Sequence, residues 1–201
     1  MRSRFMGDGA LLVELDGPDL AHALRRALLR EDLAGVKELI PGQASLLIVA
    51  DPLVADLDAI AAHLPAVKAE PMLAGRLHEF DVVYEGEDLP SLAKELGMGV
   101  SELVRRHTQA VYEVAFLGFV PGFGYLTGLD PALRVARRSK PRIRVPAGSV
   151  ALADGYTGLY PQATPGGWHI LGRCDAQLFD ATLAQPALLA PGDRVRFKVA
   201  T

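Results

Sequence analysis

Two segments in the first part of the chain repeat their hydrophobic positions every three or four residues. Residues 17–32, GPDLAHALRRALLRED, carry such a stripe, and Pro18 is well suited to the first turn of a helix. Residues 56–64, DLDAIAAHL, carry a shorter stripe that begins at Asp56, a residue type that commonly caps helices. The pattern therefore predicts two amphipathic helices.

Strand-like patterns surround these two helices. Residues 4–15, RFMGDGALLVEL, contain apolar runs around a Gly-Asp-Gly turn signal, and residues 35–51, GVKELIPGQASLLIVAD, are two runs divided by Pro-Gly-Gln. Residues 78–86, HEFDVVYEG, alternate hydrophobic and polar positions, and we expect them to close the unit. The resulting order, β-α-β-β-α-β, predicts a ferredoxin-like domain over residues 1–85.

The pattern changes after residue 85. Residues 86–110 predict a helical lead-in, in which Ser101 is a good N-cap. From Val111 onward, short apolar runs are separated by proline- and glycine-rich turns at close intervals, which is typical of a small β-barrel or sandwich. We therefore expect an α+β fold with a second domain over residues 86–201.

The composition is that of a globular protein, with 201 residues, 50% hydrophobic and 22% charged. Twenty-one basic and 24 acidic side chains give a net charge of −3, which offers no electrostatic case for nucleic acid or an anionic membrane. The first residues lack the apolar stretch of a signal peptide, and acids and a proline interrupt the most apolar segment, 44–64. We expect a cytoplasmic protein without nucleic-acid or membrane partners.

Common catalytic signatures are missing from the sequence. It contains no phosphate-binding P-loop, no His-Glu-x-x-His zinc helix and no Gly-x-Ser-x-Gly elbow. Cys174 is the single cysteine, which excludes an internal disulfide and a multi-cysteine zinc site, and no base adjoins it in sequence. We therefore expect neither a metal nor a prosthetic group in this chain.

One loop combines glycines with aromatic residues. Residues 120–128, VPGFGYLTG, lie within a run that also contains Phe116 and Phe119. Glycines in a loop either make a turn or let a ligand approach the backbone. The pattern leaves both interpretations open, a binding surface and a structural corner.

The clearest charge feature is the basic run 134–144, RVARRSKPRIR, which contains no acid. Such a cluster either binds an anion or is a solvated loop whose aliphatic stems cover apolar surface.

Three other polar or aromatic positions are candidates for a role. His107 follows two arginines at the end of a predicted helix, where a helix dipole favours a protonated imidazole. Trp168 is most simply a packing residue, and Arg173 and Asp175 most simply form an ion pair.

Several ordered motifs resemble one family. They are FLGFVPGFGYLTGLDP, RRSKPRIRVPAGSVALA and TGLYPQATPGGWHILGR, and the resemblance is dense from residue 111 to 180. The chain is similar to the allophanate hydrolase subunit 1 family, which includes the B subunit of bacterial 5-oxoprolinase and a Kip-type inhibitor of a histidine kinase.

The resemblance implies a ferredoxin-like domain followed by a cyclophilin-like β-barrel, with the loop 120–128 on the functional face. It implies an enzyme subunit, inactive alone, that opens 5-oxoproline to glutamate at the expense of ATP together with homologous C-type and A-type subunits. ATP would be bound mainly by those partners. The alternatives are an inhibitor of histidine kinase autophosphorylation and a subunit related to allophanate hydrolase or urea carboxylase.

Residue type and motif position together give a hypothesis for the site of a small anionic substrate. The candidate catalytic residues are His107, Arg144 and Arg173; the candidate substrate-binding residues are Tyr125, Arg138, Arg142, Ser149 and Trp168. Arginines would hold a carboxylate or developing negative charge, and the histidine could relay a proton. The chain departs from the family pattern at residues 84–89, YEGEDL, which puts its specificity in question.

Overall fold

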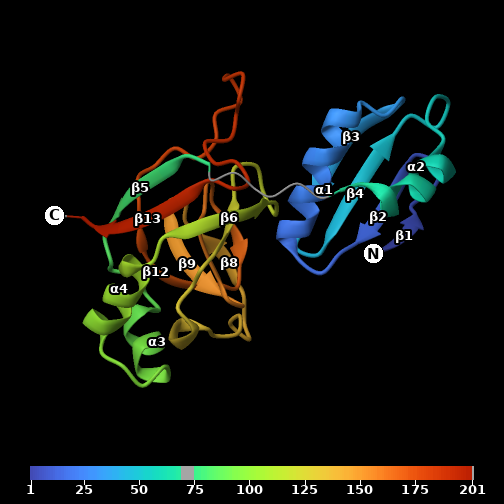
Figure 1. Ribbon diagram of the computed structural model, residues 1–201. Coiled ribbons are helices and arrows are strands. Elements are labelled where there is room, and N and C mark those ends of the chain that lie inside the picture. The colour runs from blue at the N-terminus through green and yellow to red at the C-terminus, as the bar shows by residue number, and fades with distance from the viewer. Residues whose placement is uncertain (69–74, 201) are drawn as a thin grey trace. The chain divides into compact units, whose positions relative to one another are not determined.

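The chain divides into two compact units, Met1–Leu73 and Ala74–Thr201 (Figure 1). The structure is a computed structural model that describes residues 1–68 and 75–200. The division lies about one strand earlier than the boundary near residue 85 that the sequence predicts. Each unit has a hydrophobic core of its own and is described separately.

The first unit is an antiparallel sheet in the order β1-β2-β4-β3, packed against two helices. Its elements are β1 (Arg2–Phe5), β2 (Ala10–Glu14), α1 (Pro18–Glu31), β3 (Val36–Pro41), β4 (Ser45–Ala50), α2 (Leu57–His63) and the 3-10 turn η1 (Leu64–Ala66). Alternate residues of β2 and β4, among them Leu11 and Ile48, are fully buried against α1 and α2. The Asp56 carboxylate accepts a hydrogen bond from the Ala59 N–H at 2.9 Å, so the predicted cap of α2 is confirmed.

The prediction that residues 78–86 close this unit as its last strand is wrong. Residues 77–82 form β5 (Leu77–Val82), which pairs in parallel with β13 (Arg194–Val199) in the second unit. The sheet position beside β2 is instead occupied by β1, which forms a hairpin with it. The described part of the first unit therefore has the order β-β-α-β-β-α, and its ferredoxin-like interpretation is not confirmed.

The second unit is a mixed sheet of seven strands that is nearly closed into a barrel, as Figure 1 shows. In chain order after β5 its elements are α3 (Leu89–Glu95), α4 (Val100–Gln109), β6 (Tyr112–Leu117), β7 (Gly124–Thr127), the 3-10 turn η2 (Pro131–Leu133), β8 (Arg142–Val145), β9 (Ser149–Ala153), β10 (Tyr156–Leu159), β11 (Thr164–Gly166), β12 (His169–Arg173) and β13. The strand order is β12-β9-β10-β7-β6-β13-β5, and an isolated bridge between Val83 and Arg173 joins the two edges. The predicted barrel is confirmed.

The barrel buries hydrophobic residues on both faces of β9. Val150 and Leu152 belong to the main core, whereas Ala151 and Ala153 pack on the opposite face with Trp168 and other aromatics. Strand residues that are buried on both faces produce the continuous apolar run of this segment. The two-stranded ribbon β8–β11 is a separate small sheet.

Helices α3 and α4 form the predicted helical lead-in and pack at one end of the barrel, while the loop 174–193 projects at the other (Figure 1). Helix α4 begins after Gly99, which occupies the N-cap, so the predicted cap at Ser101 is wrong and this residue lies in the first turn. Within residues 1–68 and 75–200, no helix has the length and apolar character needed to cross a membrane.

Candidate functional site

The loop 120–128 packs its aromatic side chains against the barrel. The Tyr125 ring stacks on Phe116 with centroids 4.4 Å apart, and it meets Trp168 edge-on at 5.7 Å. Trp168 is 5% exposed and also contacts Phe123 edge-on at 5.4 Å. Edge-to-face and offset contacts of this kind stabilise an aromatic cluster beyond the area that they bury. Tyr125 and Trp168 therefore act first as packing residues.

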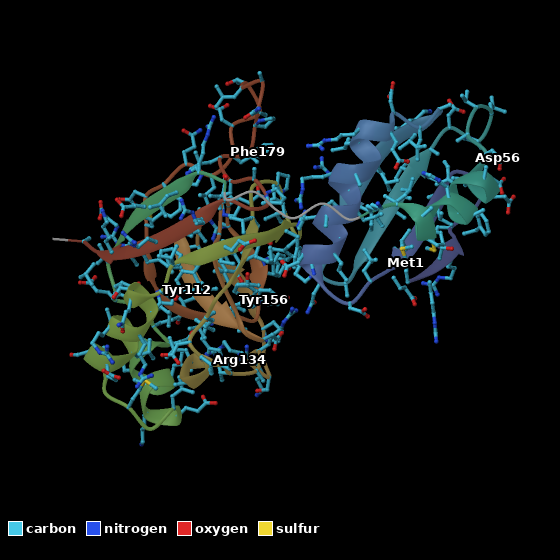
Figure 2. All side chains as sticks on the ribbon, viewed as in Figure 1. Met1, Asp56, Tyr112, Arg134, Tyr156 and Phe179 are labelled. Atoms are coloured by element: carbon cyan, nitrogen blue, oxygen red, sulfur yellow. The ribbon has the colours of Figure 1, made fainter. Side chains whose placement is uncertain are left out.

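The turn in this loop depends on a close approach of two segments. Gly122 has a φ of 82°, and a Cβ placed on it would lie 2.8 Å from the Cβ of Phe179. Phe179 stands where the loop 174–193 leaves the barrel (Figure 2). Phe119, in contrast, is 56% exposed and also has a positive φ, 68°. The loop is a structural corner, and the ring of Phe119, the residue just before it, is exposed at the surface.

Two arginines of the basic run are engaged by a buried carboxylate. One Asp88 oxygen accepts hydrogen bonds from Arg138 and, at 2.7 Å, from Arg142. The other accepts the backbone N–H of Ile170 at 2.7 Å. Arg142 also donates to Glu87 at 2.5 Å. Because acids from the segment 84–89 match their charges, these arginines link the basic run to that segment and do not form an open anion site.

A pocket of about 280 Å³ opens where the two edges of the barrel meet. It lies between the segment after β5, the turn before β9 and the end of β12; its lining residues are Val83, Glu85, Gly86, Glu87, Pro146, Ala147, Ser149, Ile170, Gly172 and Arg173. Its volume is at the lower end of the range for small-molecule sites. We take this pocket as the candidate functional site.

The pocket wall is built by backbones in close contact, which only glycine permits. A Cβ on Gly86 would lie 2.2 Å from the carbonyl oxygen of Ile170, and one on Gly172 would lie 2.4 Å from that of Val83. Reciprocal N–H to carbonyl hydrogen bonds join Val83 and Arg173 at 2.9 and 3.0 Å. The segment 83–87 is thereby attached to β12, and its acids are presented at the pocket.

His107 lies in the core of the second unit and is 0% exposed. Its Nδ1 is 2.7 Å from the Tyr84 hydroxyl, and its Nε2 is 2.9 Å from the hydroxyl oxygen of Thr157. Thr157 donates its own proton to the Ala151 carbonyl, so Nε2 carries the imidazole proton and Nδ1 accepts from Tyr84. Burial lowers the pKa of His107 to about 3 and raises that of Tyr84. A neutral, enclosed imidazole fits a structural role.

Of the residues predicted for the site, Ser149 and Arg173 line the pocket. Arg142 reaches its rim through Glu87, while Arg138 lies behind it on Asp88. Arg144 is exposed on β8, outside the pocket lining, and the remaining three, His107, Tyr125 and Trp168, lie in packed clusters. The predicted set therefore does not form one site.

Sequence reasoning missed Asp88, Glu85 and Glu87 as members of this region. The signal in the sequence is the departure from the family pattern at residues 84–89, where acids occur. The run 134–144 contains several arginines and no acid to match their charges. Among residues 1–68 and 75–200, no group of three or more His, Cys, Asp or Glu side chains is arranged to hold a metal ion.

Comparison with known proteins places the chain in a family. The family model described as carboxyltransferase domain, subdomain C and D, matches residues 1–189. The chain belongs to this family. Among curated relatives, the B subunit of 5-oxoprolinase from Escherichia coli O157:H7 is 38% identical over 210 residues, which cover 98% of this chain and 94% of the relative.

Two solved structures extend the comparison. The crystal structure of TTHA0988 is 36% identical with a TM-score of 0.86, and the match covers 100% of this chain but 41% of the other. The urea carboxylase of Kluyveromyces lactis has a TM-score of 0.77 at 20% identity, over 99% of this chain and 22% of the enzyme. This second likeness shows the fold alone. In both structures the same fold is one part of a longer chain.

Proposed function

We propose that this chain is the B subunit of a 5-oxoprolinase, and that it acts in a hetero-complex with homologous C-type and A-type subunits. The observation that carries the proposal is the 38% identity to a relative that bears the name of this subunit, since the match covers nearly the full length of both chains. A match of that extent includes both units and the residues of the pocket.

The reaction of such a complex is the opening of the 5-oxoproline lactam to glutamate. An unactivated amide carbonyl is a weak electrophile, so ATP is proposed to activate it by transferring its γ-phosphoryl group to the carbonyl oxygen, with release of ADP. One water molecule then adds to the carbonyl carbon and the C–N bond breaks, and a second water molecule releases phosphate to leave glutamate. The pocket is small for ATP, because its volume is about 280 Å³. We therefore assign ATP binding mainly to the partner subunits. We also propose that the enzyme acts in the cytoplasm.

Reconstitution of the complex tests this assignment. We expect glutamate to appear from 5-oxoproline and ATP when all three subunits are present, and to be absent when this chain is omitted or supplied alone. Glutamate formation that does not depend on this chain would contradict the proposal. In that case inhibition of histidine kinase autophosphorylation, or a role in urea or allophanate metabolism, would be tested next.

A further inference from the structure

Ser149 and Arg173 stand directly opposite each other in the antiparallel pair of β9 and β12. Side chains in such positions lie on the same face of the sheet, with Cβ atoms about 4.5–5.5 Å apart. Both residues line the pocket, Ser149 from the start of its strand and Arg173 from the end of its own. The strand register therefore presents a hydroxyl and a guanidinium side by side.

Ser149 is 3% exposed and lines the pocket. A serine hydroxyl carries one O–H donor and two acceptor lone pairs. The hydroxyl can therefore donate a hydrogen bond to a group that enters the pocket.

The charges around the pocket are divided between its walls. The side chain of Arg173 is 61% exposed, and within residues 1–68 and 75–200 its guanidinium has one ion-pair contact, a long one of 3.7 Å to the carboxylate of Asp175. On the other wall, Arg142 matches the charge of Glu87, which leaves the carboxylate of Glu85. The pocket thus offers two hydrogen-bond donors on one side and an acceptor on the other.

We propose that Ser149 and Arg173 together bind the carboxylate of a small cyclic amide, and that the wall formed by residues 83–87 accepts the amide N–H. A planar carboxylate can take one hydrogen bond from the hydroxyl and one or two from the guanidinium. The choice of 5-oxoproline as the ligand rests on the proposed function. The recognition of a carboxylate beside an N–H rests on the pocket itself.

Titration calorimetry of the full chain with 5-oxoproline tests the pairing. Ser149→Ala and Arg173→Met are each expected to weaken binding about tenfold or more, because each removes a hydrogen bond to a charged group. The matched controls are Ser139→Ala and Arg194→Met, which remove an exposed hydroxyl and an exposed guanidinium outside the pocket. Both controls are expected to bind as the unchanged chain does. Thermal unfolding establishes that every variant is folded.

A second ligand separates carboxylate recognition from general loss of the pocket. The compound 2-pyrrolidinone has the lactam ring without the carboxylate, so it should bind more weakly, and Arg173→Met should leave its affinity unchanged. An equal loss of affinity for both ligands in Arg173→Met would overturn the assignment of this residue to the carboxylate.

Failure of this inference can be told apart from failure of the proposed function. If the assembled complex forms glutamate with the same KM for 5-oxoproline when this chain carries Ser149→Ala or Arg173→Met, the pocket assignment is overturned and the subunit role stands. The absence of 5-oxoproline binding to a chain that supports turnover has the same meaning. If the complete complex forms no glutamate, the function fails, and the carboxylate pairing is judged by the titration alone.

Discussion

The phenol of Tyr84 donates a hydrogen bond to Nδ1 of the fully buried His107 across 2.7 Å. Tyr84 belongs to the segment 83–87 that forms one wall of the pocket, and His107 lies in α4, so the bond connects this wall to the helical end of the barrel. The imidazole continues the connection to Thr157 on β10. His107 therefore acts on the pocket through Tyr84 and has no access to a ligand.

Acid should destabilise the second unit through His107. Its pKa is about 3 in the folded protein and 6.5 as the ordinary value, so below pH 6.5 the unfolded chain binds a proton that the folded chain does not. Stability contributed by this group is therefore complete above pH 6.5 and falls as pH decreases toward 3, by up to about 1.4 kcal/mol per pH unit. Urea unfolding across this pH range measures the slope.

The variant His107→Gln has no imidazole to titrate, while its amide can still donate toward Thr157. We expect it to be less stable than the parent at pH 7 and to lose less stability between pH 6.5 and pH 4. Parallel stability profiles for the two proteins would show that other groups cause the acid sensitivity.

Replacing Asp88 by Asn should cost about 3 kcal/mol of unfolding free energy. The change leaves Arg142, 14% exposed, without its buried counter-charge, and a broken buried pair is strongly destabilising. Arg138 is one-third exposed, so solvent reduces its share. Asp175→Asn is the control, since its carboxylate is 92% exposed and should contribute less than about 0.5 kcal/mol. Equal effects in denaturant unfolding would argue against this role for Asp88.

Gly172→Ala should open the seam between the barrel edges. The added methyl would stand 2.4 Å from the Val83 carbonyl oxygen, a distance that forces the two segments apart. Faster hydrogen exchange of the amides of Val83 and Arg173 is the expected result. Gly118→Ala is the matched control, because its added Cβ meets nothing nearer than 3.8 Å and its backbone does not have a positive φ. Unchanged exchange in Gly172→Ala would show that the seam tolerates the displacement.

Cys174 should react slowly with thiol reagents in the folded protein. The residue is 7% exposed, and burial raises the pKa of its thiol, so little thiolate is present at pH 8. Labelling by a disulfide reagent should become fast only on addition of denaturant. Rapid labelling of the native chain would mean that this part of the barrel opens readily.

Local patterns predicted much of the fold. Pro18 does begin α1, the Pro-Gly-Gln segment does join β3 to β4, and the close spacing of turns after residue 111 does correspond to a barrel. In each case the signal lies within a few residues of the structure that it specifies. The alternation of Phe80 and Val82 also predicts a strand correctly, but alternation does not indicate which sheet a strand joins.

The site depends on pairings that no local pattern contains. Asp88 meets Arg138 and Arg142 across 50 and 54 residues, and it binds the Ile170 N–H across 82. Ser149 and Arg173 are neighbours only because of the register between their strands. Residue type alone favoured the arginines as ligand-binding groups, whereas the buried acid that engages them gives two of them a structural role.

The parallel pairing of β5 with β13 has a consequence for biosynthesis. Leu77 is partnered with Arg194, 117 residues later, so β5 leaves the ribosome long before its neighbour exists. At a translation rate of about 5–20 residues per second, that interval lasts several seconds or more. During it, the half-barrel exposes unsatisfied backbone and apolar side chains to other nascent chains. We therefore expect the chain to depend on chaperones during synthesis, because β5 is made long before β13, the strand with which it pairs.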